Sequence, residues 1–206
     1  TIRSTIPMAS GLGSSASIST AISKSIIKYL GFSISADEIS DIVYKTESLQ
    51  HGNPSGIDNT VIAHETPILY SKKTLTKPLL PIKPLYYVLA DSGKPSRTLD
   101  TVKHFNSQRK FDHSLFNTTI QKIGNIATEG ATAFQNADHK TLGYLMTKNH
   151  RLLKQLGVST QRLDTLVSVA IEAGATGAKL SGAGHGGHIV AQVTKQTIPS
   201  VVNALK

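Results

Sequence analysis

Residue types that bind phosphate gather in one short stretch near the start of the chain, IPMASGLGSSAS, Ile6–Ser17. Gly11 and Gly13 have no side chain that would block an anion, and Ser14 and Ser15 supply hydroxyls for phosphate oxygens or Mg²⁺. A helical pattern follows, so the backbone N–H groups of a helix N-terminus would face the anion. The stretch is neither a Walker A loop nor GxGxxG. Anion binding is the favoured interpretation, and close packing of a glycine turn is the alternative.

A second candidate site is TESLQHGNPSGIDN, Thr46–Asn59. Glu47 and His51 are four residues apart, so they share one face of a helix that Gly52 should end, and Asp58 follows the turn. A zinc site is poorly supported, because no further histidine has the usual spacing. Mg²⁺ bound by Glu47, a serine hydroxyl and phosphate oxygens is better matched, which leaves Asp58 to accept a proton. The alternative is an ordinary helix end with an Asn-Pro turn.

The third stretch, KLSGAGHGGH, contains four glycines within six positions: Gly182, Gly184, Gly186 and Gly187. Such a loop lets the backbone approach a ligand or another loop closely. A tight β-turn between two strands is the alternative.

The periodicity of apolar residues predicts the elements that would position these stretches. Residues 1–7 are expected to end a strand. A helix over Ser15–Leu30 should close at Gly31. A capping box at Ser35–Glu38 should begin a second helix. Residues 56–70 are expected to form short strands with a turn. The apolar faces of the two helices are Ile18, Ile22, Ile26 and Leu30, and Ile39, Ile42, Val43 and Thr46.

The second half of the sequence is predicted to be mainly helical. It follows a buried strand at Leu85–Asp91, with a domain boundary near Pro84. One helix carries Leu115, Ile120, Ile123, Ala127 and Phe134, with a break near Gly130. Two more helices should end at Gly157 and Gly174, followed by strand, glycine loop and strand, and then a short amphipathic segment from Pro199.

Composition limits the class of protein. The chain has 206 residues, 39% of them hydrophobic, no cysteine and a net charge of +9. It therefore has no disulfide scaffold, and we expect a reducing, cytoplasmic location. No apolar run approaches the roughly 18 residues of a membrane span, and no membrane partner is expected. The basic stretch Ser71–Pro84 is interpreted as a solvated connection, and because aromatic residues do not interleave with basic ones, no nucleic-acid partner is expected.

Together the three stretches resemble the GHMP small-molecule kinases. PMASGLGSSAS is similar to the second motif of that superfamily and KLSGAGHGGHIVA to the third. ESLQHGNPSGIDN is similar to the pattern of the mevalonate kinases within it, and DSGKPSRT, Asp91–Thr98, resembles their substrate-side segment. The resemblance extends from Ile6 to Val193.

The resemblance implies transfer of the γ-phosphoryl group of ATP to the primary hydroxyl of mevalonate, giving 5-phosphomevalonate in isoprenoid biosynthesis. It implies that Asp58 is catalytic, that Ser15 and Glu47 bind Mg²⁺, and that the third-motif glycines support the loop. The phosphate loop would be Gly11, Leu12, Gly13, Ser14, Ser15 and Ala16, and the residues near mevalonate would be His51, Ser55, Thr98 and Ala183.

The implied fold is α+β, a two-domain GHMP-kinase sandwich. Residues 1–84 would be a partial nucleotide-binding domain, similar to domain 2 of ribosomal protein S5, and residues 85–206 a C-terminal domain of helices on an antiparallel sheet. The second motif begins close to residue 1, so the resemblance implies a fragment that lacks the first motif with its lysine and is inactive alone. A homodimer is a further possibility that the sequence leaves undecided.

Besides the absent first motif there is one further departure from the family pattern, and two kinds of alternative function remain. His185 stands in the third motif where glycine is commoner, and its side chain could narrow the loop or touch a phosphate. Other kinases of the superfamily, such as phosphomevalonate or homoserine kinase, share the glycine motifs. A non-catalytic RNA-binding module is the remote alternative, and it rests on the net charge of +9.

Overall fold

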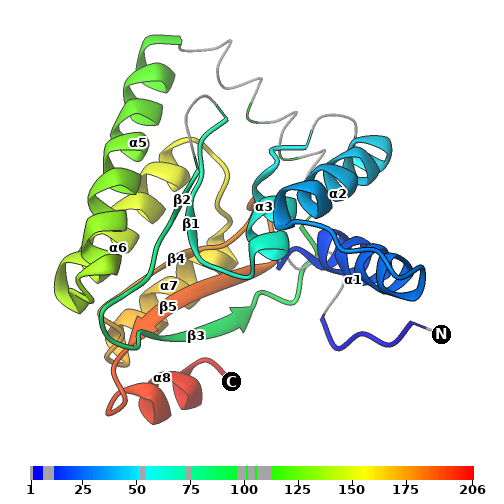
Figure 1. Cartoon of the computed structure of the whole chain (residues 1–206). Helices are drawn as coiled ribbons and strands as arrows, with labels where there is room; N and C mark the ends of the chain where they lie inside the picture. Colours follow the sequence, from blue (N-terminus) through cyan, green and yellow to red (C-terminus); the bar gives the residue numbers. More distant parts are fainter. Residues whose placement is uncertain are drawn as a thin grey trace. The chain divides into compact units, whose positions relative to one another are not determined.

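The computed structural model describes residues 2–6, 12–51, 54–72, 76–96, 101, 105 and 113–206 (Figure 1). The chain separates into two compact units, and the division along the sequence falls between Leu79 and Leu80. No helix in the described ranges combines the length and apolar character that crossing a membrane requires.

The first unit consists of three helices and a two-stranded antiparallel pair. A small core of Ala16, Ile39, Val43 and Ala63 joins the three helices. No strand forms within described residues 2–6, so the strand expected there was wrong over that range. The elements are α1 Ser14–Tyr29, α2 Ala36–His51, α3 Ile57–His64, β1 Ile68–Leu69 and β2 Lys77–Pro78.

Helix α1 ends where the sequence predicted. Gly31 adopts a left-handed conformation with φ of 76°. Its N–H donates to the Lys28 carbonyl at 3.2 Å, and the Phe32 N–H donates to the Ile27 carbonyl at 3.1 Å. These two bonds are the Schellman pattern, which satisfies the last carbonyls of a helix.

The predicted apolar face of α1 was wrong. Ile22, Ile26 and Leu30 are exposed, whereas the buried positions of the helix are Ala16 and Thr20. Helix α1 packs against α2 and α3, so tertiary contact selects its small-residue side. Spacing alone shows that isoleucines share a face, but not that the face is covered.

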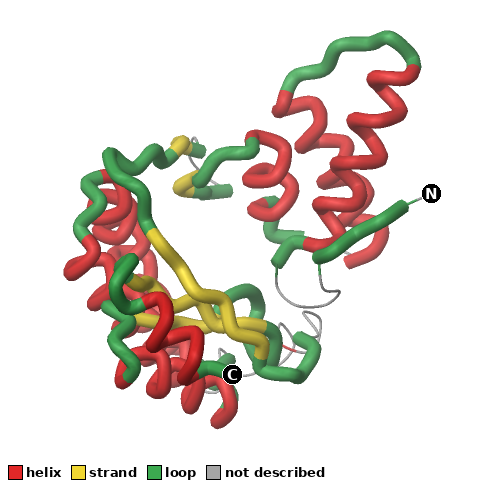
Figure 2. The backbone as a smooth tube through the Cα atoms, turned by 90° about the horizontal axis from the view of Figure 1, so that it is seen from below, coloured by secondary structure: helices red, strands yellow, loops and turns green. Residues whose placement is uncertain are grey.

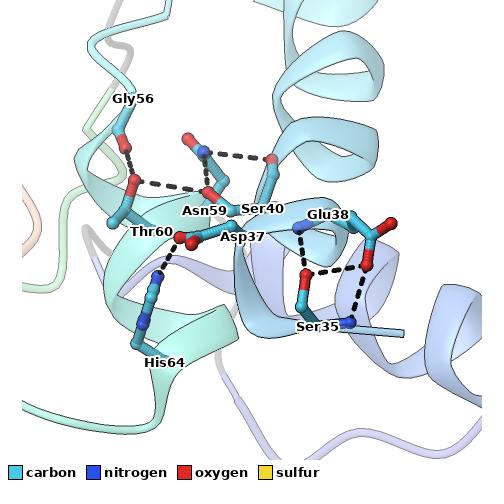
Figure 3. A network of polar contacts seen from close by, with 8 residues as sticks. All are labelled: Ser35, Asp37, Glu38, Ser40, Gly56, Asn59, Thr60 and His64. Atoms are coloured by element: carbon cyan, nitrogen blue, oxygen red, sulfur yellow. Dashed lines mark hydrogen bonds and ion pairs between the residues drawn. The ribbon is translucent and has the colours of Figure 1, made fainter. Parts of the chain in front are cut away.

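Helix α2 begins with the predicted capping box (Figure 3). The Glu38 N–H donates to Ser35 Oγ at 3.2 Å, and the Ser35 N–H donates to Glu38 Oε2 at 2.9 Å. Ile39 and Val43 are buried as predicted, whereas Ile42 is exposed.

The strands predicted within residues 56–70 are largely replaced by helix α3. Its β-branched residues favoured a strand, but stronger local signals begin a helix at this point. Gly56 caps it in a left-handed conformation, and Asp58 lies in the first turn, where a carboxylate is favourable. The Thr60 hydroxyl donates to the Gly56 carbonyl at 2.6 Å, which stabilises that turn. Only the two-residue strand Ile68–Leu69 follows.

The second unit packs helices on a three-stranded antiparallel sheet of order β3-β5-β4 (Figure 2). Helices α6 and α7 pack against the sheet, α5 packs against α6, and α8 packs against α7 and β3. The predicted strand–glycine loop–strand unit is confirmed by β4 and β5. The elements are β3 Tyr86–Asp91, α5 His113–Gln135, α6 His139–Gln155, α7 Gln161–Glu172, β4 Gly177–Leu180, β5 His188–Val193 and α8 Ile198–Ala204.

Two expectations about this unit were wrong in detail. Strand β3 forms, but it alternates between faces instead of being buried throughout, and Tyr87 and Leu89 are exposed. Helix α5 runs through Gly130 without a break, since one glycine costs only about 1 kcal/mol in a helix of this length. Its buried positions are Phe116, Thr119, Ile126, Ala131 and Ala133, whereas Leu115 and Ile120 are exposed. The helix ends predicted at Gly157 and Gly174 are confirmed by their left-handed φ values of 70° and 105°.

Helix α6 and strand β4 meet backbone to backbone at two glycines. A Cβ atom added to Gly177 would overlap the carbonyl of Gly143, and one added to Gly143 would overlap the carbonyl of Thr176. Neither obstacle is the end of a flexible side chain, so a methyl group could enter only if the helix moved off the sheet.

We therefore expect Gly143→Ala and Gly177→Ala each to lower the free energy of unfolding by about 1–3 kcal/mol, as overpacking does. Gly124→Ala is the matched control, because it lies in α5 with open space around its Cβ position. It should raise stability by about 0.5–1 kcal/mol. Denaturant unfolding measures all three, and equal stability of Gly143→Ala and Gly124→Ala would disprove the close approach.

Candidate functional site

The candidate site is built around the N-terminus of α1 in the first unit. Gly13 is the N-cap residue, with φ of 66° and ψ of 29°, and its carbonyl accepts the Ser17 N–H at 2.9 Å. Gly13 offers no side-chain cap to the first-turn N–H groups, which are the groups that bind anions at a helix N-terminus. This turn contains Ser14, Ser15 and Ala16, all predicted from sequence to contact phosphate.

The two residues predicted to bind Mg²⁺ lie in contact. The Ser15 hydroxyl, on the first turn of α1, donates to Glu47 Oε1 at 2.5 Å. Glu47 comes from α2 and is only 7% exposed. A buried carboxylate needs polar partners, because removing it from water is otherwise costly. The α1–α2 packing therefore places a fixed carboxylate beside the start of α1.

Asp58 approaches the same turn from α3. A Cβ atom built on Gly13 would lie 3.8 Å from Asp58 Cγ and 3.0 Å from Ile62 Cδ1. Partial burial raises the pKa of Asp58 above its ordinary 3.8, and the nearby Glu47 carboxylate raises it further. The Asp58 side chain is nevertheless exposed in part, so a small molecule can reach it. A carboxyl group whose pKa is raised by burial and by a neighbouring carboxylate is typical of acid–base and metal sites.

The donor set fits Mg²⁺. A serine hydroxyl and a carboxylate are hard oxygen ligands, which suit this ion. Within the described part of the chain, no group of three or more His, Cys, Asp or Glu side chains could hold a metal. Ser15 and Glu47 alone would be a partial ligand set for this ion, and phosphate and water oxygens would have to complete it.

Helix α3 is fixed to α2 by polar contacts that the sequence interpretation missed (Figure 3). The Asn59 amide donates to the backbone carbonyl of Ser40 at 3.2 Å and to its hydroxyl at 2.9 Å. Asn59 is 5% exposed. At the other end of α3, His64 Nε2 lies 2.9 Å from Asp37 Oδ1. These contacts set the position of Asp58. The available signal was the asparagine beside Asp58, a residue type seldom buried without such bonds.

The remaining predicted residues are distributed as follows. Ser55 lies at the exposed start of α3, where its hydroxyl accepts the Ile57 N–H at 3.3 Å. Leu12 precedes Gly13 and is half-buried. Ala183 belongs to the second unit and is half-buried. Gly11, Thr98 and the side chain of His51 lie outside the described residues.

In the second unit, the glycine loop packs against the segment DSGKPS. The Gly187 N–H donates to the Lys94 carbonyl at 2.7 Å, and the Ser96 hydroxyl donates to the Gly184 carbonyl at 2.6 Å. A Cβ on Gly186 would lie 2.6 Å from the Lys94 carbonyl oxygen. The fold thus joins two motifs that are far apart in sequence. The loop glycines Gly182, Gly184, Gly186 and Gly187 all have positive φ.

His185 is the one non-glycine residue of this loop with a positive φ, 58°. Its Nε2 lies 2.9 Å from the Gly157 carbonyl, and its backbone N–H donates to the Val158 carbonyl at 2.9 Å. The ring therefore holds the loop against the turn between α6 and α7.

A buried polar cluster beneath this turn was also missed. His150, 4% exposed, accepts the Leu180 N–H at Nδ1, and its Nε2 lies 3.1 Å from Asp164 Oδ1. The Ser159 hydroxyl donates to the same carboxylate oxygen at 2.6 Å. Burial lowers the pKa of His150, although the Asp164 carboxylate opposes the shift. Helices α6 and α7 and strand β4 are thereby tied together at the base of the loop.

Known protein families and proteins match most of this chain in sequence. Residues 1–65 match the family model of the GHMP kinases N terminal domain, and residues 131–206 match that of the GHMP kinases C terminal domain. A mevalonate kinase of Pyrococcus furiosus is 37% identical over 191 residues, which is 90% of this chain and 57% of that protein. One from Pyrococcus horikoshii is 38% identical over 191 residues. The chain therefore spans less than two thirds of the length of these relatives.

Solved structures agree. Mevalonate kinase of L. major, solved in complex with R-mevalonate, superposes with a TM-score of 0.87 at 30% identity, covering 94% of this chain and 60% of that one. The Methanococcus jannaschii enzyme gives 0.86 at 27% identity, covering 98% and 63%. Streptococcus pneumoniae phosphomevalonate kinase shares the fold at 16% identity and a TM-score of 0.79. The motifs in order, the site around α1 and these matches lead to one conclusion: the chain belongs to the GHMP kinases.

Proposed function

We propose that the protein containing this chain is an ATP-dependent mevalonate kinase, which forms 5-phosphomevalonate. The observation that carries the proposal is the meeting of Ser15, Glu47 and Asp58 at the N-terminus of α1. The sequence identity of 37–38% between this chain and mevalonate kinases supports mevalonate as the substrate. The likeness to phosphomevalonate and homoserine kinases, at 16% and 19% identity, extends only to the fold.

The phosphates of ATP are assigned to the loop Gly11–Ala16 and the first turn of α1. Backbone N–H groups and the helix dipole favour negative charge at this position. Mg²⁺ would be held by Ser15 and Glu47, and when bound it neutralises charge on the phosphates. The nucleotide-binding domain is assigned to residues 1–84 and the C-terminal domain to residues 85–206. The protein is assigned to the cytoplasm.

Asp58 is assigned the role of accepting the proton of the mevalonate hydroxyl that attacks the phosphate. The hydroxyl oxygen bonds to the γ-phosphorus, the bond from that phosphorus to the β–γ bridging oxygen breaks, and ADP leaves. The hydroxyl proton passes to an Asp58 carboxylate oxygen. The raised pKa increases the affinity of the Asp58 carboxylate for the hydroxyl proton. The residues assigned to bind the alcohol substrate, mevalonate, are His51, Ser55, Thr98 and Ala183.

A substrate panel tests the proposal. The complete protein, with ATP and Mg²⁺, should phosphorylate mevalonate with a kcat/KM at least about 100-fold above that for phosphomevalonate, homoserine or galactose. Discrimination of this size follows when a site is built for one set of polar groups. Coupled measurement of ADP release provides the values, and preference for another alcohol would refute the assignment.

Asp58→Asn should lower kcat for mevalonate by about 10²–10⁴, the usual contribution of a general base. Nucleotide affinity should change little, because the loop and Glu47 are intact. Asp41→Asn, an exposed position on α2, is the matched control and should keep full turnover. Calorimetric ATP binding and steady-state kinetics separate the two effects. Full turnover by Asp58→Asn would remove Asp58 from the mechanism.

The same variant should be more stable than the wild type at pH 7. The native pKa of Asp58 is raised, so native structure favours its protonated form. That stabilisation is present below the ordinary value of 3.8 and is lost as pH rises through the native pKa. Asparagine does not ionise, so the variant does not lose this stability as pH rises. Thermal unfolding should show a higher Tm for Asp58→Asn at pH 7 and a smaller difference near pH 3.5. A constant difference across this range would contradict the raised pKa.

A further inference from the structure

The turn that leads into α3 is held by residues that belong to none of the motifs. The Tyr70 hydroxyl donates to the backbone carbonyl of Ser55 at 2.8 Å. Lys72 Nζ donates to the carbonyl of Pro54 at 3.1 Å. Both residues follow β1, so the segment after this strand supplies two donors to consecutive carbonyls of the turn.

Gly56 shows how closely Tyr70 covers this turn. Its φ is 90°, and a Cβ atom built on it would overlap the Tyr70 hydroxyl oxygen and lie 3.6 Å from Tyr44 Cε2. Gly56 is the N-cap residue of α3, and Asp58 stands two residues later in the first turn. The phenol therefore lies against the backbone that sets where the helix begins.

The Tyr70 hydroxyl is well suited to a permanent tether. Partial burial raises its pKa above the ordinary value of 10.0, and the neighbouring Tyr44 adds to the shift. The phenol thus keeps its proton and remains a donor at neutral pH.

We propose that Tyr70 is a positioning residue: its bond to the Ser55 carbonyl fixes residues 54–56, the turn that leads into α3, and with it the placement of Ser55 and Asp58 toward the alcohol substrate. The inference rests on the proposed function. Nucleotide phosphates are assigned instead to the start of α1.

A purely structural role for the hydroxyl is less consistent with its surroundings. Tyr70 is half-buried and lies outside the small core of Ala16, Ile39, Val43 and Ala63. The Asn59 amide bonds to Ser40 hold the body of α3 independently. Loss of the hydroxyl should therefore loosen the turn while the rest of the unit keeps its packing.

Tyr70→Phe in the complete protein tests the inference, with Tyr29→Phe as the matched control, because Tyr29 is 89% exposed at the end of α1. We expect Tyr70→Phe to lower kcat/KM for mevalonate about tenfold. KM for ATP should stay within about twofold of wild type, and Tm within about 2 °C. Amide hydrogen exchange at residues 55–58 should accelerate at least about threefold. Tyr29→Phe should match the wild type in every measurement.

The outcomes are distinguishable. Unchanged mevalonate kinetics would overturn the inference, whether or not exchange at the turn accelerates. An equal loss for mevalonate and ATP together with a lower Tm would also overturn it, since Tyr70 would then be a general structural residue. If the wild type fails to use mevalonate, the proposed function fails. Accelerated exchange confined to residues 55–58 would then still support the tether, and unchanged exchange would refute it.

Discussion

The site depends on keeping two carboxylates close together against their mutual repulsion. Glu47 and Asp58 come from different helices, and the pKa of Asp58 is raised by its burial and further by the nearby Glu47 carboxylate. The Ser15 hydroxyl satisfies Glu47, and the positive end of the α1 dipole lies beside both. The remaining repulsion between the two carboxylates is offset by the packing of α1, α2 and α3 and by the hydrogen bonds between Asn59 and Ser40. A cation bound between the two carboxylates would reduce this repulsion, so the arrangement of the three helices favours cation binding.

The features that the sequence predicted well are those encoded within a few residues. The capping box at Ser35, the glycine ends of helices and the strand–loop–strand unit at Lys179 each depend on neighbouring positions. The association of Ser15, Glu47 and Asp58 was predicted through the motif pattern. Helix α3 was missed because its β-branched residues favour strands, while its start is set by a left-handed glycine whose conformation no propensity shows.

Other contributions could not be predicted because they are contacts between distant segments. Asn59 and Ser40 are ordinary polar residues until α2 and α3 pack together. Tyr70 has a role only once the segment after β1 lies beside the turn that leads into α3. The exposed isoleucines of α1 show the converse, since an apolar stripe does not reveal what covers it. Gly143 and Gly177 likewise look like isolated helix and strand glycines until two backbones meet at them.

The pairing of Asp91 with His188 has a consequence for how the second unit folds. Strand β3 must wait for β5 across roughly a hundred intervening residues, and such long-range closure is entropically slow. Helices α5 to α7 and the β4–β5 hairpin depend on short-range contacts and can form first. We therefore expect the contacts between the glycine loop and DSGKPS, which adjoin the paired ends of β3 and β5, to form late in folding. Substitutions there should then chiefly speed unfolding and shorten the lifetime of the native protein, with little effect on the rate of its formation.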